Sequence, residues 1–195
     1  MTIGQLNTFL KTSPSPLFVF ITGASGTGKT FLAKTIEQRL NSNLVSVVYF
    51  DQIGVPSLEE MIEKFGSAEK WQESMTYKWV QQLASMKDKK VILLEGQFNP
   101  QFAMDACKEY KIQHFLLILL HADKKIREHR LIKQRVQPEL ANETMENWAR
   151  FLKRKTQELE GTIIDTSDSN FESHLNKIVG LFKENLHKVV LHVVK

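Results

Sequence analysis

One segment near the N-terminus restricts the fold of this chain more than any other feature. Residues 23–30 read Gly-Ala-Ser-Gly-Thr-Gly-Lys-Thr, which matches the pattern G-x-x-x-x-G-K-[ST]. A short apolar run at 17–21 precedes the segment, and a helical pattern at 31–40 follows it. A glycine-rich turn between a buried strand and a helix lets several backbone N–H groups converge on one phosphate. The sequence therefore predicts that this loop binds a polyphosphate.

Each part of the loop has an expected role in holding a nucleotide. The helix that begins after the loop has partial positive charge at its N-terminus, and this charge favours an anion there. Lys29 is placed to reach the β- and γ-phosphates of ATP, and the Thr30 hydroxyl can ligate the Mg²⁺ ion that bridges them. The residues predicted to contact the nucleotide are Gly23, Ser25, Gly26, Thr27, Gly28, Lys29 and Thr30.

Four further runs read as buried strands, at 44–50, 91–94, 115–120 and 162–164. They are apolar throughout rather than alternating, which is typical of a parallel sheet covered on both faces. Amphipathic helical patterns fill the intervals and give the order β-α-β-α-α-β-α-β-α-α-β-α. This order predicts a three-layer α/β fold, with residues 1–195 forming a single domain. The tail at 187–195 does not fit this scheme; an extra strand, an edge pairing and a cloning remnant are the alternatives, and no function is predicted for it.

Composition excludes several classes of protein. Lysine and arginine exceed aspartate and glutamate by only four charges, so nucleic acid is an unlikely partner. The one cysteine, Cys107, cannot form an intramolecular disulfide and reads as a small buried hydrophobe. No apolar run approaches the ~18–20 residues of a membrane span, and no signal peptide is recognised. We therefore expect a cytoplasmic protein without a membrane partner; its oligomeric state is not predicted.

The loop, the chain length and the strands that end on Asp51 and Glu95 resemble the nucleoside/nucleotide kinase-like group of P-loop proteins, such as adenylate, cytidylate, shikimate and gluconate kinases. The stretches YFDQIGVPS, LLEGQ and QPEL followed by WARFLKRK are also similar to an uncharacterised bacterial set of predicted P-loop kinases or ATPases. The resemblance covers about residues 17–185. It implies a five-stranded parallel sheet of order 2-3-1-4-5, ATP and Mg²⁺ as cofactors, and a mobile arginine-bearing lid at about 124–150.

Two acidic residues lie where ligands bind in an open α/β sheet, at the carboxyl ends of strands. Asp51 could orient or deprotonate an acceptor hydroxyl; the alternative is a turn-forming aspartate. Glu95 stands where P-loop proteins place a second acidic group for Mg²⁺, but glutamate replaces the usual aspartate, so metal and substrate roles both stay open. Gln97 could hydrogen-bond the acceptor, although both residues could simply form a helix-entry loop. No arginine lies in 90–113, which argues against a nucleoside monophosphate acceptor by comparison with the family.

The basic stretch 124–135 is the candidate lid. Arg127 and Arg130 are three residues apart on a predicted helix, which places both on one face. Arg130 and Arg135 match the lid arginines of the kinase group best by position, and Arg127 is a candidate nucleotide contact. A solvated basic face is the alternative for each of them. The turn at 165–167 is a candidate contact for the base, or a plain helix-capping turn.

The leading prediction is therefore an ATP-dependent kinase that phosphorylates an unidentified small acceptor. An ATP-switched binding module and a polynucleotide-end kinase are the alternatives. A GTPase would carry an [NT]-K-x-D motif, and the Asn-Lys-Ile-Val at 176–179 lacks the aspartate. Neither the LSGGQ signature of a transporter ATPase nor the Asp-Glu strand end of a ring ATPase is present.

Overall fold

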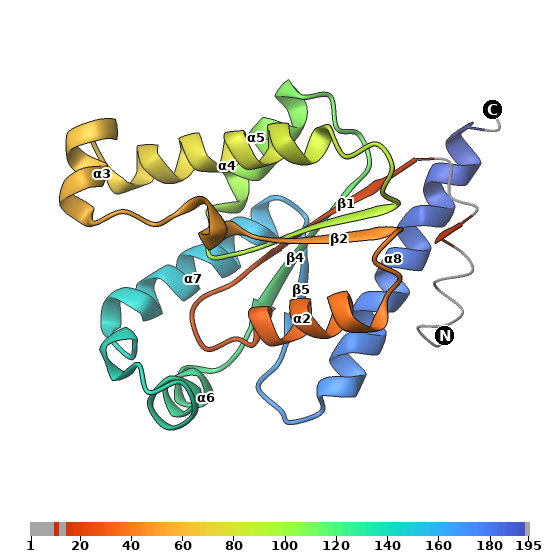
Figure 1. Ribbon diagram of the computed structural model, residues 1–195. Helices are drawn as coiled ribbons and strands as arrows, with labels where there is room; N and C mark the ends of the chain where they lie inside the picture. Colours follow the sequence, from red (N-terminus) through yellow and green to blue (C-terminus); the bar gives the residue numbers. More distant parts are fainter. Residues whose placement is uncertain (1–9, 12–14, 194–195) are drawn as a thin grey trace.

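The computed structural model describes residues 10–11 and 15–193, and its side chains up to residue 186. Five parallel strands form one sheet in the order β2-β3-β1-β4-β5, as predicted (Figure 1). The strands are β1 (Leu17–Thr22), β2 (Val45–Tyr49), β3 (Val91–Glu95), β4 (Phe115–His121) and β5 (Thr162–Asp165). Because β1 lies in the middle, the loop that follows it emerges at the centre of the carboxyl edge of the sheet.

The helices follow the predicted order along the chain. The α-helices are α2 (Lys29–Arg39), α3 (Leu58–Phe65), α4 (Ala68–Ala84), α5 (Pro100–Glu109), α6 (Lys124–His129), α7 (Glu143–Glu158) and α8 (Phe171–Val193). Three shorter helical turns complete the described part: the 3₁₀ turn η1 (Phe50–Ile53), the π-helical turn η2 (Arg130–Gln134) and the 3₁₀ turn η3 (Pro138–Leu140). The predicted three-layer α/β/α architecture is thus confirmed.

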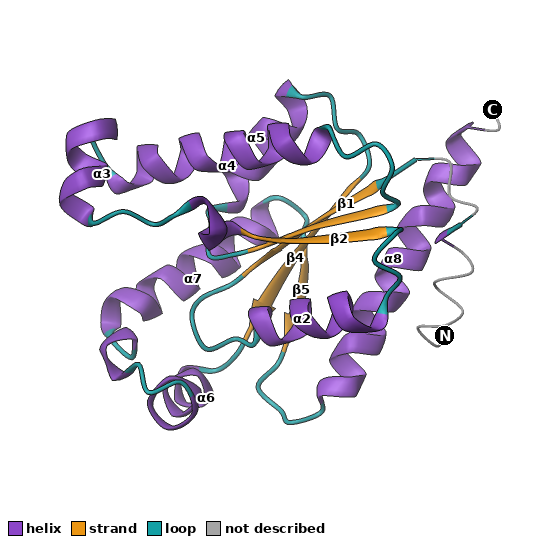
Figure 2. Ribbon diagram, viewed as in Figure 1, coloured by secondary structure: helices purple, strands orange, loops and turns teal. Residues whose placement is uncertain are grey.

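Two apolar clusters hold the three layers together, one on each face of the sheet (Figure 2). On one face, Leu32 and Ile36 of α2 and Phe182 of α8 pack against β1 and β4. On the other face, Trp71 and Trp79 of α4 pack with α5 and the end of α7. Strand residues such as Phe20 and Ile21 point to opposite faces and are both fully buried, which is why the strands are apolar at every position.

Side-chain caps fix where several helices begin. A capping box begins α3, since Ser57 Oγ accepts from the Glu60 N–H and the Glu60 carboxylate accepts from the Ser57 N–H. Asn99 caps α5 through the Gln101 N–H, with Pro100 as the first helical residue. Asn142 caps α7 in the same way. These caps set the start of the two helices that border the site.

The C-terminal prediction is wrong in one respect. Helix α8 continues to Val193, so residues 187–193 are helical rather than an added strand. The β-branched residues of this segment favour a strand locally. The segment is nevertheless helical because it extends a helix that is already formed, whereas a strand would need a sheet edge to pair with. Cys107 is buried as predicted, and burial raises the pKa of its thiol to about 12. None of the helices in the described part of the chain is long and apolar enough to cross a membrane.

Candidate nucleotide-binding and phosphoryl-transfer site

The loop between β1 and α2 adopts a conformation that only glycine permits at two positions. Gly26 has φ 84°, and a Cβ atom there would lie 2.9 Å from the carbonyl oxygen of Arg127. A Cβ on Gly23 would lie 2.4 Å from the carbonyl oxygen of Leu120. These close approaches let the lid and β4 pack directly on the loop. In the described part of the chain, no backbone N–H from residue 24 to residue 31 donates a hydrogen bond, which leaves this whole run of donors available to an anion.

Lys29, the first residue of α2, is turned back over the loop. Its side chain is buried, and Nζ donates to the carbonyl oxygen of Ala24 at 3.1 Å. Burial lowers the pKa of Lys29 below its usual value, while the nearby Glu95 carboxylate opposes this shift and the Arg135 guanidinium adds to it. One carbonyl oxygen satisfies a single donor of the ammonium group, so the others remain available to phosphate oxygens.

Glu95 ends β3 beside the first turn of α2. It is 5% exposed, and the Thr30 hydroxyl lies 3.4 Å from both of its carboxylate oxygens. Burial raises the pKa of Glu95, and the Lys29 ammonium partly opposes that rise. Asp51 lies in η1, is exposed, and lines a cavity with Thr30 and Glu95. Two strand ends therefore bring two carboxylates to one place beside the loop, as the sequence predicted.

The residues around Thr30 suit Mg²⁺. The described residues hold no cluster of three or more histidine, cysteine, aspartate or glutamate side chains that could cage a metal. Magnesium, however, is commonly held by one or two protein oxygens together with nucleotide phosphates and water. Thr30 Oγ1 and the Glu95 carboxylate supply oxygen ligands only, next to the free N–H groups of the loop. This donor set fits a nucleotide-bound Mg²⁺ ion.

The three candidate arginines have different surroundings. Arg130 Nη1 and Nη2 donate to the carbonyl oxygens of Gly26 and Thr166, and its side chain lines cavities on both sides of the loop. Arg135 is exposed, its side chain makes no hydrogen bond or ion pair with the described residues, and it lines the cavity that contains Lys29. These two arginines are therefore near the expected triphosphate position.

Arg127 does not fit the nucleotide contact expected of it. Its side chain is buried, Nη2 is bound to the Glu146 carboxylate of α7, and Nε donates to the Ala122 carbonyl oxygen at 3.2 Å. Arg127 and Arg130 remain three residues apart on helical backbone, since the Arg130 N–H still donates to the Ile126 carbonyl oxygen, but their side chains reach different partners. In this arrangement Arg127 fastens α6 to α7.

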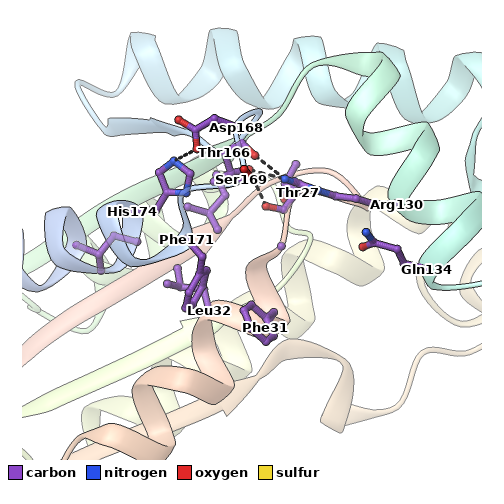
Figure 3. A pocket seen from close by; sticks show the side chains of 13 residues that line it. Thr27, Phe31, Leu32, Arg130, Gln134, Thr166, Asp168, Ser169, Phe171 and His174 are labelled. Atoms are coloured by element: carbon purple, nitrogen blue, oxygen red, sulfur yellow. Dashed lines mark hydrogen bonds and ion pairs between the residues drawn. The ribbon is translucent and has the colours of Figure 1, made fainter.

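A cavity of about 230 Å³ lies next to the loop, between α2, the turn after β5 and the start of α8 (Figure 3). Phe31 and Phe171 form its apolar wall with ring centroids 4.6 Å apart, and Arg130 lies across from them. Thr166, in the turn singled out as a base contact, lines the cavity and donates to the Thr27 carbonyl oxygen at 2.9 Å. His174 pairs with Asp168 at 3.1 Å on the rim.

A larger groove of about 770 Å³ lies on the other side of the loop, and we call it the α4–α7 groove. Gln97 connects it to the loop, because its Oε1 accepts from Ser25 Oγ at 3.0 Å. The side chains that line it come from α4, the segment after β3, α5, η3 and α7 with its N-cap. They are Ala68, Glu69, Gln72, Gln97, Asn99, Phe102, Leu140, Asn142, Thr144, Met145, Asn147, Trp148 and Phe151.

Some of the residues that line these two cavities were named from the sequence. For the smaller cavity these are Thr27, Gly28, Arg130 and the turn at 165–167, and for the groove it is Gln97. Phe31, Phe171 and most of the groove were missed. Phe31 is an exposed aromatic residue on the polar side of an amphipathic helix pattern, and this unusual position could have indicated the smaller cavity.

The parallel sheet with β1 at its centre, the glycine loop and the buried lysine define a P-loop nucleoside-triphosphatase fold of the kinase-like type. The AAA domain family matches residues 19–149, which is two thirds of the chain, so the chain belongs to this family. β3 nevertheless ends in Leu-Glu-Gly, without the Asp-Glu pair expected of a ring ATPase. No curated protein matches the chain at a significant level.

Solved kinase structures share the fold. The shikimate kinase of Acinetobacter baumannii, solved with shikimate, has 17% identity and a TM-score of 0.59, with 90% of this chain and 97% of that chain covered. The gluconokinase of Sinorhizobium meliloti 1021 has 13% identity and a TM-score of 0.61, with 92% and 96% covered. At such identities the likeness concerns the fold, and it confirms the predicted resemblance to the nucleoside/nucleotide kinase-like group.

Proposed function

We propose that the protein is an ATP-dependent kinase that transfers the γ-phosphoryl group of ATP to a hydroxyl group of a small molecule. The observation that carries this proposal is the run of unpaired N–H groups at residues 24–31 around the buried ammonium of Lys29. Such a concentration of donors with one buried cation suits a triphosphate. The family and the kinase folds of the structural neighbours support the same class.

The nucleotide occupies the loop with its base in the cavity of Phe31 and Phe171. Bound ATP supplies the transferable phosphoryl group, and Mg²⁺ held by Thr30 and Glu95 neutralises phosphate charge. Gly23, Ser25, Gly26, Thr27 and Gly28 form the cradle. Lys29, Arg130 and Arg135 surround the phosphates, where positive charge stabilises the transition state.

The acceptor approaches from the side of Asp51, Glu95 and Gln97. The acceptor hydroxyl oxygen forms a bond to the γ-phosphorus as the bond to the β–γ bridging oxygen breaks, and ADP leaves. Asp51 receives the hydroxyl proton, and Gln97 orients the acceptor. Positioning and electrostatics supply most of the rate increase, since no covalent enzyme intermediate is needed.

Substitution of Lys29 tests this proposal. We expect Lys29→Met to lower phosphoryl transfer by about 10²–10³-fold because one preorganised cation is lost. Lys78→Met is the matched control, since Lys78 is exposed on α4 away from the loop, and its transfer rate should equal that of the wild type. The assay follows radiolabel from γ-³²P-ATP into products in mixtures of sugars, nucleosides and small acids.

The same assay separates the proposal from its alternatives. ADP formed without any phosphorylated acceptor, and only after a protein partner is added, would favour the ATP-switched module. Label appearing on oligonucleotide ends would favour the polynucleotide-end kinase. Equal transfer by Lys29→Met and wild type would reject the kinase assignment.

A further inference from the structure

The chemical class of the acceptor can be argued from the α4–α7 groove, and this argument rests on the proposed function. The groove reaches the loop at the Ser25–Gln97 hydrogen bond, two residues after Glu95. A molecule bound in it can therefore extend a hydroxyl group toward the phosphate end of the nucleotide. The groove is large enough for a compound of the size of a sugar or a nucleoside.

The groove is unusual for a kinase acceptor site in its charge. Among the described residues that line it, only Glu69 is ionisable, and no lysine, arginine or histidine lines it. The chain also holds no arginine between Arg39 and Arg127, the part that supplies the α4 and β3 sides of the groove. A carboxylate or phosphate bound here would lose its hydration without gaining a cation, which is strongly unfavourable.

Two arginines of α6 and α7 already have carboxylate partners. Arg150 of α7 pairs with Glu143 at 2.7 Å, and Arg127 pairs with Glu146. Lys34 lines the cavity that holds Asp51 and Glu95 and is not among the residues that line the groove. None of these groups is placed to receive a second anion inside the groove.

The groove instead presents neutral hydrogen-bond donors. The side-chain amide nitrogens of Gln97 and Asn99 make no hydrogen bond with any described residue, and their oxygens are already used by Ser25 and the Gln101 N–H. Gln72 holds this segment in place, because its Nε2 donates to the Gln97 carbonyl oxygen at 3.2 Å and its Oε1 accepts from the Asn99 N–H at 2.8 Å. Two preorganised amide donors suit carbonyl or hydroxyl oxygens of a ligand.

Part of the lining is apolar and aromatic. Trp148 and Phe151 of α7 stack with ring centroids 5.0 Å apart and planes at 17°, and Phe102 and Met145 line the same groove. The indole Nε1 of Trp148 is buried without a hydrogen-bond partner in the described structure. Aromatic side chains and amide donors in one groove favour a ligand with one flat or apolar face and polar edges.

We propose that the phosphoryl acceptor is an uncharged hydroxyl compound with a ring that carries carbonyl or hydroxyl groups, the chemical class of nucleosides and neutral sugars. Carboxylates and phosphate esters are excluded by the lack of a cation in the groove. The product, in contrast, is a dianion, and its charge favours its release from such a groove.

The direct test uses pairs of acceptors that differ mainly in charge. Uridine is compared with uridine 5′-monophosphate, and glucose with gluconate, each at 1 mM with γ-³²P-ATP and Mg²⁺. We expect transfer to at least one neutral member, at a rate at least ~10-fold above that of its anionic partner. Preferred transfer to an anionic member would overturn this inference and leave the kinase assignment intact.

Binding is measured separately, so that the inference is tested even if no acceptor is phosphorylated. With a non-hydrolysable ATP analogue occupying the nucleotide site, the neutral probes should change the tryptophan fluorescence, and Trp148→Phe should remove that change. Trp71 and Trp79 lie in the core and supply the constant background. Absence of binding by both neutral probes, or tighter binding of the anionic ones, would contradict the inference.

A substitution that places a positive charge in the lining of the groove tests the inference further. Thr144 lines the groove and is exposed, so Thr144→Arg should fold and bring a cation to the ligand. We expect it to increase the affinity for the anionic probes by about 10-fold through a charge-assisted hydrogen bond. Thr144→Gln introduces a side chain of similar reach without a charge, and it should leave the affinity for both anionic probes unchanged. Equal affinities of the two variants for uridine 5′-monophosphate would show that the groove is not where acceptors bind, and this result would overturn the inference.

Discussion

The ion pair between Arg127 and Glu146 gives the sharpest stability prediction. The Arg127 side chain is 4% exposed and that of Glu146 is 20% exposed, and the pair joins α6 to α7 across the lid. Replacing Glu146 by leucine leaves a buried guanidinium whose remaining partner is the Ala122 carbonyl oxygen. Removal of one partner from a buried pair costs about 3–5 kcal/mol, and the partial exposure of Glu146 places this case near 3 kcal/mol.

The partner substitutions extend this prediction to a double-mutant cycle. Arg127→Met should cost less, about 1–2 kcal/mol, because Glu146 can turn to water and lies 3.9 Å from Arg150 Nε. The double variant Arg127→Met/Glu146→Leu should lose only about 1 kcal/mol, mainly the hydrogen bond to the carbonyl oxygen of Ala122. The coupling energy is then about 3 kcal/mol.

Urea unfolding monitored by circular dichroism measures these differences. With a slope of about 2 kcal/mol/M, a loss of 3 kcal/mol lowers the midpoint by about 1.5 M. Glu158→Leu is the control, since Glu158 forms only surface pairs with Arg154 and Lys155 on α7 and little change is expected. A coupling energy near zero would refute this account of Arg127. A fall of at least ~10-fold in the ATP affinity of the double variant would also refute this account, because that loss is expected if Arg127 binds phosphate.

Three further outcomes follow from the site. Asp51→Asn should abolish phosphoryl transfer while ATP affinity, measured by calorimetry, stays unchanged; a loss of ATP affinity would instead assign Asp51 to the nucleotide or its metal. Gly26→Ala should destabilise the protein by about 1–3 kcal/mol in urea unfolding, because the alanine would be strained at φ 84° and 2.9 Å from the Arg127 carbonyl oxygen. Burial raises the pKa of Glu95, so the wild type loses stability as pH rises through that raised pKa. Glu95→Gln should therefore be the more stable protein at pH 7.5, with a difference that shrinks below pH ~4, and a constant difference across this range would contradict the assignment.

The strands, their order and the loop could be predicted from the sequence. Five largely apolar runs indicate a covered parallel sheet, and the strand order is what the resemblance to the kinase group implies. The carboxyl ends of β2 and β3 lie at the edge where ligands bind in such a sheet, which is why Asp51 and Glu95 could be named as candidates.

The surroundings of the arginines could not be predicted in this way. The i, i+3 spacing places Arg127 and Arg130 on one side of the helix, but it does not say which partners two long side chains reach. The partner of Arg127 lies on another helix, at Glu146, and no local pattern links two side chains across a chain reversal. The sequence therefore identified a basic lid but not which of its arginines is structural.

The α4–α7 groove escaped prediction for a related reason. Its lining comes from α4, the turn after β3 and α7, and each of these segments shows only the ordinary pattern of an amphipathic helix or a helix entry. The Gln72 side chain binds the Gln97 carbonyl oxygen and the Asn99 N–H, although Asn99 is 27 residues away in the chain. Such arrangements depend on packing, so they become visible only when the three segments are placed together.

The central claim is that the backbone donors of residues 24–31 and the Lys29 ammonium hold the phosphates of ATP. A crystal structure of the protein with Mg²⁺ and a non-hydrolysable ATP analogue tests it most directly. We predict that the β- and γ-phosphates accept hydrogen bonds from this run of N–H groups, and that Lys29 Nζ has left the Ala24 carbonyl oxygen to contact them. An analogue bound elsewhere, with the Lys29–Ala24 hydrogen bond still in place, would contradict the claim.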